Sequence, residues 1–217
     1  MVILVIVVGV VLLLRFVDPP TWSWKLQREF NPPAGYPKQP RHHWLELDQI
    51  APAVLLAVIA SEDQRFPNHH GIDFDAIYKA VEGAVRGRRL RGASTLTQQT
   101  AKNLFLWSRR DFSRKFMEVG LALLLELIWD KHRILEVYLN IVEFGPGIYG
   151  IEAASEYWYH QSADSITERQ AARLAAVLPS PWKYRAEPAT PYVAERARWI
   201  EQQMDQLGYA WLAPMGD

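Results

Sequence analysis

Two neighbouring carboxylates stand at the end of a long apolar run in this sequence. The run covers residues 53–60, and Glu62 and Asp63 follow it after a single serine. A carboxylate at the end of a hydrophobic helix is partly removed from water, so its pKa tends to rise and it can accept a proton near neutral pH. The position therefore makes Glu62 a candidate general base, and an ordinary helix end followed by a cap is the alternative.

Positive charge is concentrated in one segment of a chain that carries 24 basic and 24 acidic residues. Between residues 86 and 115 a single acid, Asp111, stands against nine basic residues, which are Arg86, Arg88, Arg89, Arg91, Lys102, Arg109, Arg110, Arg114 and Lys115. A strong local field on a neutral protein favours a local anionic ligand.

A stretch of small and hydroxyl-bearing residues, 92–103, lies inside this basic segment. Its composition predicts a helix N-terminus with Ser94 or Thr95 as the cap, and the exposed amides of such a terminus can bind an anion. A capped polar helix without a ligand is the alternative. The apolar stretch 104–107, next to Arg109 and Arg110, suits either an anionic membrane surface or the protein core.

Helical periodicity dominates the chain after residue 45, so helices must position these groups. We expect Asp73 to cap a helix over 74–86 and Thr167 to cap another that runs to residue 178. A last amphipathic helix is expected over 192–207. We find no alternation of strands with helices and no phosphate loop, and the fold class is therefore mainly α.

The run 119–129 is nearly all apolar but too short to span a bilayer, so we interpret it as a buried central helix. Glu118, Ala122 and Glu126 share one face of this helix, and buried carboxylates need partners. Arg114 lies one helical turn before Glu118, which by itself predicts an ordinary surface ion pair.

The chain divides into three parts by composition. Residues 1–17 are apolar apart from Gly9 and Arg15, and we interpret them as one N-terminal transmembrane helix, with Trp22 and Trp24 near the interface. Residues 18–44 are rich in proline, glycine and tryptophan and are expected to form a linker or an extended arm. Residues 45–217 are expected to form one domain.

Composition excludes several classes of protein. Hydrophobic residues make up 49% of the chain, which argues against disorder, and zero net charge argues against a generally basic nucleic-acid binder. The absence of cysteine excludes disulfides and thiolate metal sites.

The sequence resembles the family 51 peptidoglycan glycosyltransferases in five motifs, which follow the family's order between about residues 45 and 185. The motifs are Glu62-Asp63-x-x-Phe66-x-x-His69-x-Gly71, then Gly92-x-Ser94-Thr95-x-Thr97-Gln98-Gln99 with Lys102-Asn103, then Arg114-Lys115-x-x-Glu118, then Lys131-x-x-Ile134-Leu135-Glu136-x-Tyr138-Leu139-Asn140, and a looser one over 171–181. Two departures, Ala93 and Leu96, involve no chemically active group.

The resemblance implies a lysozyme-like helical domain that polymerises lipid II into β-1,4 glycan strands by inversion, with release of undecaprenyl pyrophosphate. It implies Glu62 as general base and Glu118 as a second essential carboxylate. The substrate-binding residues that it implies are Asp63, Phe66, Ser94, Thr97, Gln98, Gln99, Lys102, Asn103, Arg114 and Lys115.

The resemblance also sets expectations for ligands and location. Glu118 could share a divalent cation, Mg²⁺ or Mn²⁺, with the pyrophosphate, and no other metal ligand and no organic cofactor are expected. The expected partners are lipid II, the growing glycan strand, the membrane and other proteins of cell-wall synthesis or division, but no nucleic acid. The expected location is the periplasmic face of the cytoplasmic (inner) membrane, held by one membrane span.

The sequence leaves two alternative functions open, and it does not predict a transpeptidase domain. A lytic transglycosylase or lysozyme-type hydrolase also places a glutamate in a helical cleft but does not need cations for a pyrophosphate. An inactive membrane scaffold for cell-wall assembly is the other alternative. We expect no transpeptidase domain, because there is no K-T-G and the one S-x-x-K match begins at Ser180 in a proline-rich loop.

Overall fold

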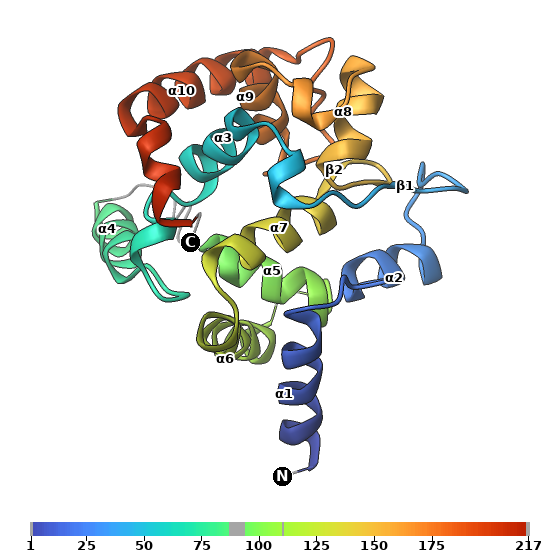
Figure 1. Cartoon of the computed structure of the whole chain (residues 1–217), viewed down its shortest axis with the longest axis vertical. Coiled ribbons are helices and arrows are strands. Elements are labelled where there is room, and N and C mark those ends of the chain that lie inside the picture. The colour runs from blue at the N-terminus through green and yellow to red at the C-terminus, as the bar shows by residue number, and fades with distance from the viewer. Residues whose placement is uncertain (1, 87–93, 110, 216–217) are drawn as a thin grey trace.

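The computed structural model describes residues 2–86, 94–109 and 111–215, and helices dominate its regular structure (Figure 1). The α-helices are α1 (Val2–Leu14), α2 (Ser23–Phe30), α3 (Pro52–Glu62), α4 (Phe74–Val85), α5 (Leu96–Phe105), α6 (Phe112–Ile128), α7 (Lys131–Ile141), α8 (Ile151–Tyr159), α9 (Glu168–Val177) and α10 (Pro191–Leu207). Short 3-10 helices are η1 (Leu47–Gln49), η2 (Phe66–Asn68), η3 (Ala163–Ser165) and η4 (Tyr209–Met215). The mainly α class is therefore confirmed.

A small sheet joins the beginning of the chain to its middle. Its strands are β1 (Arg41–His42), β2 (Glu143–Gly145) and β3 (Ile148–Tyr149), in the order β1-β3-β2. The strand β1 runs parallel to β3, and β2 runs antiparallel to it. Residues 18–44, for which an arm was expected, contain both α2 and β1, and β1 joins them to the later strand β3.

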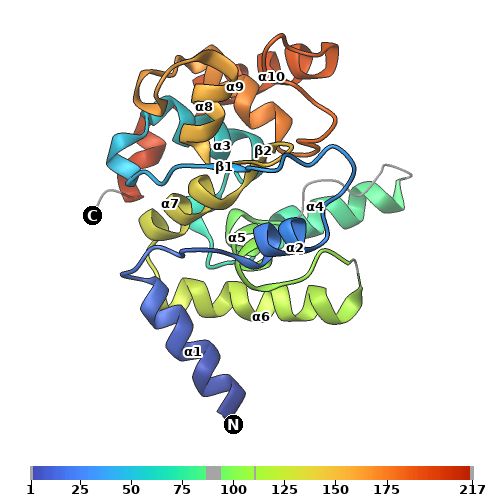
Figure 2. The ribbon, with the colours of Figure 1, turned by 90° about the vertical axis from the view of Figure 1, so that its right-hand side faces the viewer.

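The helix α7 crosses the middle of the molecule, and all its residues from 133 to 141 are buried. Figure 2 shows α3, α8, α9 and α10 on one side of it, and α5 and α6 on the other. Two polar side chains of α7 hold the chain that leads into the domain. Glu136 accepts a hydrogen bond from the amide of Leu47, and Asn140 exchanges two with the backbone of Leu45. The fourth motif therefore fastens this segment to the central helix.

Several helices are capped at their N-termini by the side chains that the sequence predicts. The carboxylate of Asp73 accepts from the amide of Ala76 at the start of α4. Thr95, not Ser94, caps α5, and Thr167 caps α9, each in a reciprocal pair with a glutamine three residues later. These caps are confirmed because each depends only on residues within one helical turn.

The expected transmembrane helix over residues 1–17 is not supported by the structure. The helix α1 has 13 residues, whereas a span needs ~20. Nowhere in residues 2–86, 94–109 or 111–215 does a helix combine the length and the apolar character that crossing a membrane requires.

The interpretation of 119–129 as a buried central helix is wrong. In α6 only Glu118, Ala122 and Leu125 are buried. Within the run, Leu123 and Leu127 are exposed, and Leu121, Leu124 and Ile128 are only partly buried. Before the run, Phe112, Phe116 and Met117 of α6 are exposed as well. A nearly continuous apolar run has no distinct polar face to mark the solvent side, so periodicity could not reveal that only part of it is buried.

Candidate functional site

Glu62 is the last residue of α3 and lies where this buried helix leaves the core. Residues 53–60 of this helix are all buried, whereas Glu62 is half-buried. Its Oε2 accepts a hydrogen bond of 2.9 Å from Nε2 of Gln99 on α5. Burial raises the pKa of Glu62, although the hydrogen bond from Gln99 and the charge of Arg196 act in the opposite direction. A raised pKa favours uptake of a proton, which is what a general base requires.

Lys102 lies one helical turn after Gln99 on α5. Burial lowers the pKa of Lys102, and the neighbouring Arg114 lowers it further, while Glu118 and Glu62 raise it. The ammonium also lies 5.5 Å from the ring centroid of Trp24, on α2. A carboxylate from α3 and a cation from α5 therefore share one partly dry environment.

A cluster of charges on α6 completes the site. Arg114 Nη1 lies 2.9 Å from Glu118 Oε2, and Lys115 pairs with the other oxygen of the same carboxylate. The Lys115 ammonium also lies 3.2 Å from the hydroxyl of Ser94, so the second and third motifs meet here.

The expected surface ion pair between Arg114 and Glu118 is in fact buried. Their side chains are 12% and 4% exposed, whereas that of Lys115 is 45% exposed. The spacing of four residues correctly predicted that Arg114 and Glu118 pair. The packing of α6 on α5 removes most of the pair from solvent. The Nε of Arg114 is buried without a hydrogen-bond partner among the described residues. A buried unpaired donor is costly unless a ligand completes it.

Five of the predicted substrate-binding residues are buried within the protein, namely Asp63, Phe66, Thr97, Gln98 and Asn103. Asp63 accepts hydrogen bonds from Nε2 of His69 at 2.9 Å and from the amide of Leu96 at 2.9 Å. Because Leu96 is the first residue of α5, Asp63 fixes the end of α3 against the start of α5. This contact brings Gln99 within reach of Glu62.

The buried Thr97 belongs to a second network beneath the site. Its hydroxyl donates to Glu126 at 2.6 Å, and Lys131 donates to the same oxygen at 2.7 Å. Lys131 also donates to the carbonyl of His69 at 2.6 Å. Motifs one, two and four are thus joined by hydrogen bonds, and the carboxylate of Glu126, whose side chain is 6% exposed, has the partner that it needs.

Two residues of this site lie outside the motifs and were not assigned to it from the sequence. Arg196, on α10, donates to the carbonyl of Ser61 at 3.2 Å and is the second largest influence opposing the raised pKa of Glu62. Trp24, in the arm, contacts Lys102. No local signal marks Arg196, which occupies an ordinary position of an amphipathic helix.

Four basic residues of the segment 86–115 lie outside the described residues, namely Arg88, Arg89, Arg91 and Arg110.

Glu118 fits poorly as a direct ligand of Mg²⁺ or Mn²⁺. Both of its oxygens already pair with cationic side chains. A divalent cation would also meet the positive charges of Lys102, Arg114 and Lys115. We derive no chemical step through a metal at this position.

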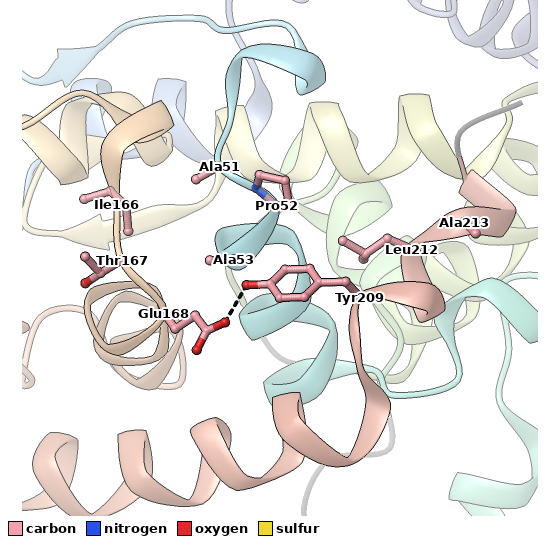
Figure 3. Close-up of a pocket in the computed structure, with 9 residues that line it drawn as sticks. All are labelled: Ala51, Pro52, Ala53, Ile166, Thr167, Glu168, Tyr209, Leu212 and Ala213. Carbon is pink, nitrogen blue, oxygen red and sulfur yellow. Dashed lines mark hydrogen bonds between the residues drawn. The ribbon is translucent and has the colours of Figure 1, made fainter.

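Two hollows lie outside this cluster. One, of about 780 Å³, is formed by the start of α3, the start of α9 and η4, and the Tyr209 hydroxyl donates to Glu168 across it at 2.7 Å (Figure 3). It lies at the opposite end of α3 from Glu62. The other, of about 890 Å³, lies between α1, α2 and the end of α5. Neither is lined by Glu62 or Glu118.

Comparison with known proteins identifies the family of this chain. A family model described as transglycosylase matches residues 30–205. The chain is 55% identical to a biosynthetic peptidoglycan transglycosylase of Shewanella oneidensis, over 95% of this chain and 88% of the relative. It is 56% identical to a protein of the same name from Aeromonas hydrophila, over 91% of this chain and 84% of the relative. With its motifs on adjoining helices and a family match over most of its length, this chain belongs to the transglycosylase family.

Proposed function

We propose that this chain is a peptidoglycan glycosyltransferase that polymerises lipid II into β-1,4 glycan strands. The observation that carries the proposal is the placement of Glu62, a carboxylate with a raised pKa, near Lys102, which itself lies near Arg114 and Lys115 on the neighbouring helix. The names of the relatives from Shewanella oneidensis and Aeromonas hydrophila support the same substrate class.

In the proposed reaction Glu62 takes the proton of the acceptor sugar's 4-hydroxyl. The resulting oxygen attacks the anomeric carbon of the donor as the bond from that carbon to the pyrophosphate breaks. Attack from the face opposite the α-linked pyrophosphate gives a β linkage by inversion. Gln99 orients the base, because its amide nitrogen donates to one carboxylate oxygen of Glu62.

The cations hold the departing pyrophosphate. Negative charge grows on the leaving oxygen in the transition state, and fixed positive groups in a partly dry site stabilise that charge strongly. The half-exposed ammonium of Lys115 is the donor most accessible to it, and the guanidinium of Arg114 lies on the same helix beside it. Glu118 positions both cations, since each of its oxygens pairs with one of them. A divalent ion, if required, would arrive with the pyrophosphate.

We divide the predicted substrate-binding residues into two groups. Ser94, Gln99, Lys102, Arg114 and Lys115 contact substrate, because none of them is fully buried. Asp63, Phe66, Thr97, Gln98 and Asn103 hold the helices in place, because they are buried.

We further propose that α6 faces the membrane that holds the lipid-linked substrate. Phe112, Phe116 and Leu127 are 97%, 81% and 81% exposed, on the same helix as Arg114 and Lys115. In both views α1 and α6 lie at the same end of the molecule (Figures 1 and 2). Apolar side chains beside cations suit an anionic membrane surface, and the periplasmic face of the inner membrane is the location where lipid II would be met.

The decisive experiment compares wild type with Glu62→Gln on purified lipid II, with products separated on a gel. The amide keeps the shape of the side chain but cannot accept the proton, so the rate of strand formation should fall by ~100-fold or more. Wild type should convert lipid II into long strands and should not cut preformed glycan. A variant that retained more than about a tenth of the rate would remove Glu62 as the base. Cutting of preformed strands by wild type would instead support the hydrolase alternative.

A further inference from the structure

A second cluster of polar side chains lies on α8 and on the chain just after β1. It consists of His43, Glu152 and Glu156, whose potential ligand atoms all lie within 4.8 Å of one another. The two glutamates are one helical turn apart on α8, and α8 packs against β1 (Figure 1). None of the three belongs to the site around Glu62.

Glu152 is the member that points most clearly to a cation. Glu152 is only 6% exposed. Its Oε2 accepts hydrogen bonds from the amide of Ala163 at 2.7 Å and from the hydroxyl of Ser162 at 3.4 Å. Within the described part of the chain, its Oε1 has no hydrogen-bond partner and no lysine or arginine pairs with it. A largely buried carboxylate whose charge no neighbouring cation balances is well suited to bind one.

The two other members are free to turn toward Glu152. His43 and Glu156 are exposed, and neither side chain forms a hydrogen bond or ion pair with another described residue. The nearby Arg41 is occupied elsewhere, since its guanidinium lies 5.3 Å from the ring centroid of Tyr157. No lysine or arginine among the described residues therefore forms an ion pair with this cluster.

We propose that His43, Glu152 and Glu156 bind one divalent transition-metal ion, with zinc as the best-suited metal. One imidazole and two carboxylates are common zinc ligands, and a water would fill the fourth position. Zinc bonds of ~2.0–2.2 Å place ligand atoms roughly 3.5 Å apart, so the exposed side chains need only a small movement. The imidazole disfavours Mg²⁺ and Ca²⁺, which prefer oxygen ligands.

The hydrogen bonds to Glu152 strengthen the case for a built site. The amide of Ala163 and the hydroxyl of Ser162 fix one oxygen and leave the other directed to a ligand, which is the usual arrangement around metal-binding carboxylates. Because His43 follows β1 and both glutamates belong to α8, a bound ion would fasten the end of the arm to the domain.

The test is a zinc titration of the tag-free chain, treated with EDTA and desalted, in competition with a chromophoric chelator. Wild type should bind one Zn²⁺ per chain. His43→Gln and Glu156→Gln change exposed side chains and should each weaken binding at least tenfold without altering the circular-dichroism spectrum. His132→Gln and Glu195→Gln, which remove the same residue types from other helices, are the matched controls and should bind as wild type does.

Thermal melting provides an independent readout. Saturating Zn²⁺ should raise the Tm of wild type and of both controls by about 5 °C, and should leave the two cluster variants unchanged. Absence of stoichiometric binding by wild type would overturn the proposal. Equal affinity in wild type and in both cluster variants would overturn it as well, since the ion would then bind elsewhere.

Discussion

At the scale of single residues, Glu62 has two properties that oppose each other. Its burial makes it a better base, because burial raises its pKa. The same burial makes the ionised form unfavourable in the folded protein. The folded state therefore holds the proton more tightly than the unfolded chain, and the stability present at low pH is lost as the pH rises through the raised pKa.

The variant Glu62→Gln should consequently be more stable than wild type above that pKa, while it is inactive. The gain in Tm should be clear at pH 8 and should vanish near pH 4, where wild type is protonated. In wild type, kcat/KM should rise with pH through a midpoint above ~4.3, the ordinary glutamate value. Thermal melting across pH and the pH profile of turnover measure the two effects. Equal or lower stability of the variant at pH 8 would contradict the role given to burial.

The two cations of α6 should respond differently to removal, because their exposure differs. Lys115→Ala removes a half-exposed ammonium and should change stability by less than about 1 kcal/mol, while kcat/KM on lipid II falls on the order of a hundredfold. Arg114→Ala breaks a buried contact and should cost about 1–3 kcal/mol of stability as well as activity. Lys79→Ala, on the exposed face of α4, is the control. Near-normal turnover of Lys115→Ala would place the phosphate site elsewhere.

At the scale of elements, α2 has a fixed position on α5. The hydroxyl of Ser23 and the side-chain Nε2 of Gln27 both donate to the backbone carbonyl of Leu106, each at 2.9 Å. Leu106 directly follows the end of α5. Gln27 also accepts from the amide of Ser108 at 2.8 Å. These bonds satisfy a backbone group that a helix end leaves unpaired. They hold α2 in place independently of Trp24, the residue of α2 that contacts Lys102.

Trp24→Leu should therefore reduce turnover without detaching α2. A partly desolvated cation–π contact contributes ~1–2 kcal/mol, so we expect kcat/KM to fall roughly 5- to 30-fold, mainly through the placement of Lys102. Trp24→Phe retains a ring face and should recover most of the loss. Recovery by phenylalanine is the measurement that separates positioning of the cation from general packing. If both variants were equally impaired, the indole's hydrogen bond to Glu143 at 3.4 Å would be the important contact.

At the scale of the whole molecule, the end of α1 is tied to the central helices. The guanidinium of Arg133 donates to the carbonyls of Leu14 and Val17 at 3.0 Å, and the indole of Trp129 donates to that of Val11 at 2.8 Å. Arg133 is itself buried and also pairs with Glu136. The orientation of α1 is thus set by α7 and by the segment that precedes it.

Deletion of residues 1–17 should therefore destabilise the domain. It removes several hydrogen bonds to a buried cation, and we expect a loss on the order of 3 kcal/mol, or roughly 10 °C in Tm for a chain of this size. Deletion of residues 2–9 is the matched control, because it shortens α1 but keeps its contacts with Trp129 and Arg133. Melting of both deletions in one detergent makes the comparison. Equal Tm values would show that these contacts contribute nothing.

The sequence by itself determined the class of fold, the order of the motifs and several helix starts. Asp73 and Thr167 cap their helices because capping depends on residues three positions apart, which a linear chain already places together. Glu62, Lys102 and Lys115 could be selected as candidates because their types suit a base and an anion site. Glu118 and Glu126 could be expected to need partners because a shared helix face follows from spacing alone.

Only the tertiary structure decided which groups surround the base and which face solvent. Arg196 and Trp24 reach the site from opposite ends of the chain, and no local pattern encodes such contacts. The burial of Arg114 and the exposure of Phe116 follow from how α6 lies on α5. An apolar run is equally compatible with a protein core and with an outward apolar face. Its environment is set by packing against distant segments, and periodicity carries no information about that packing.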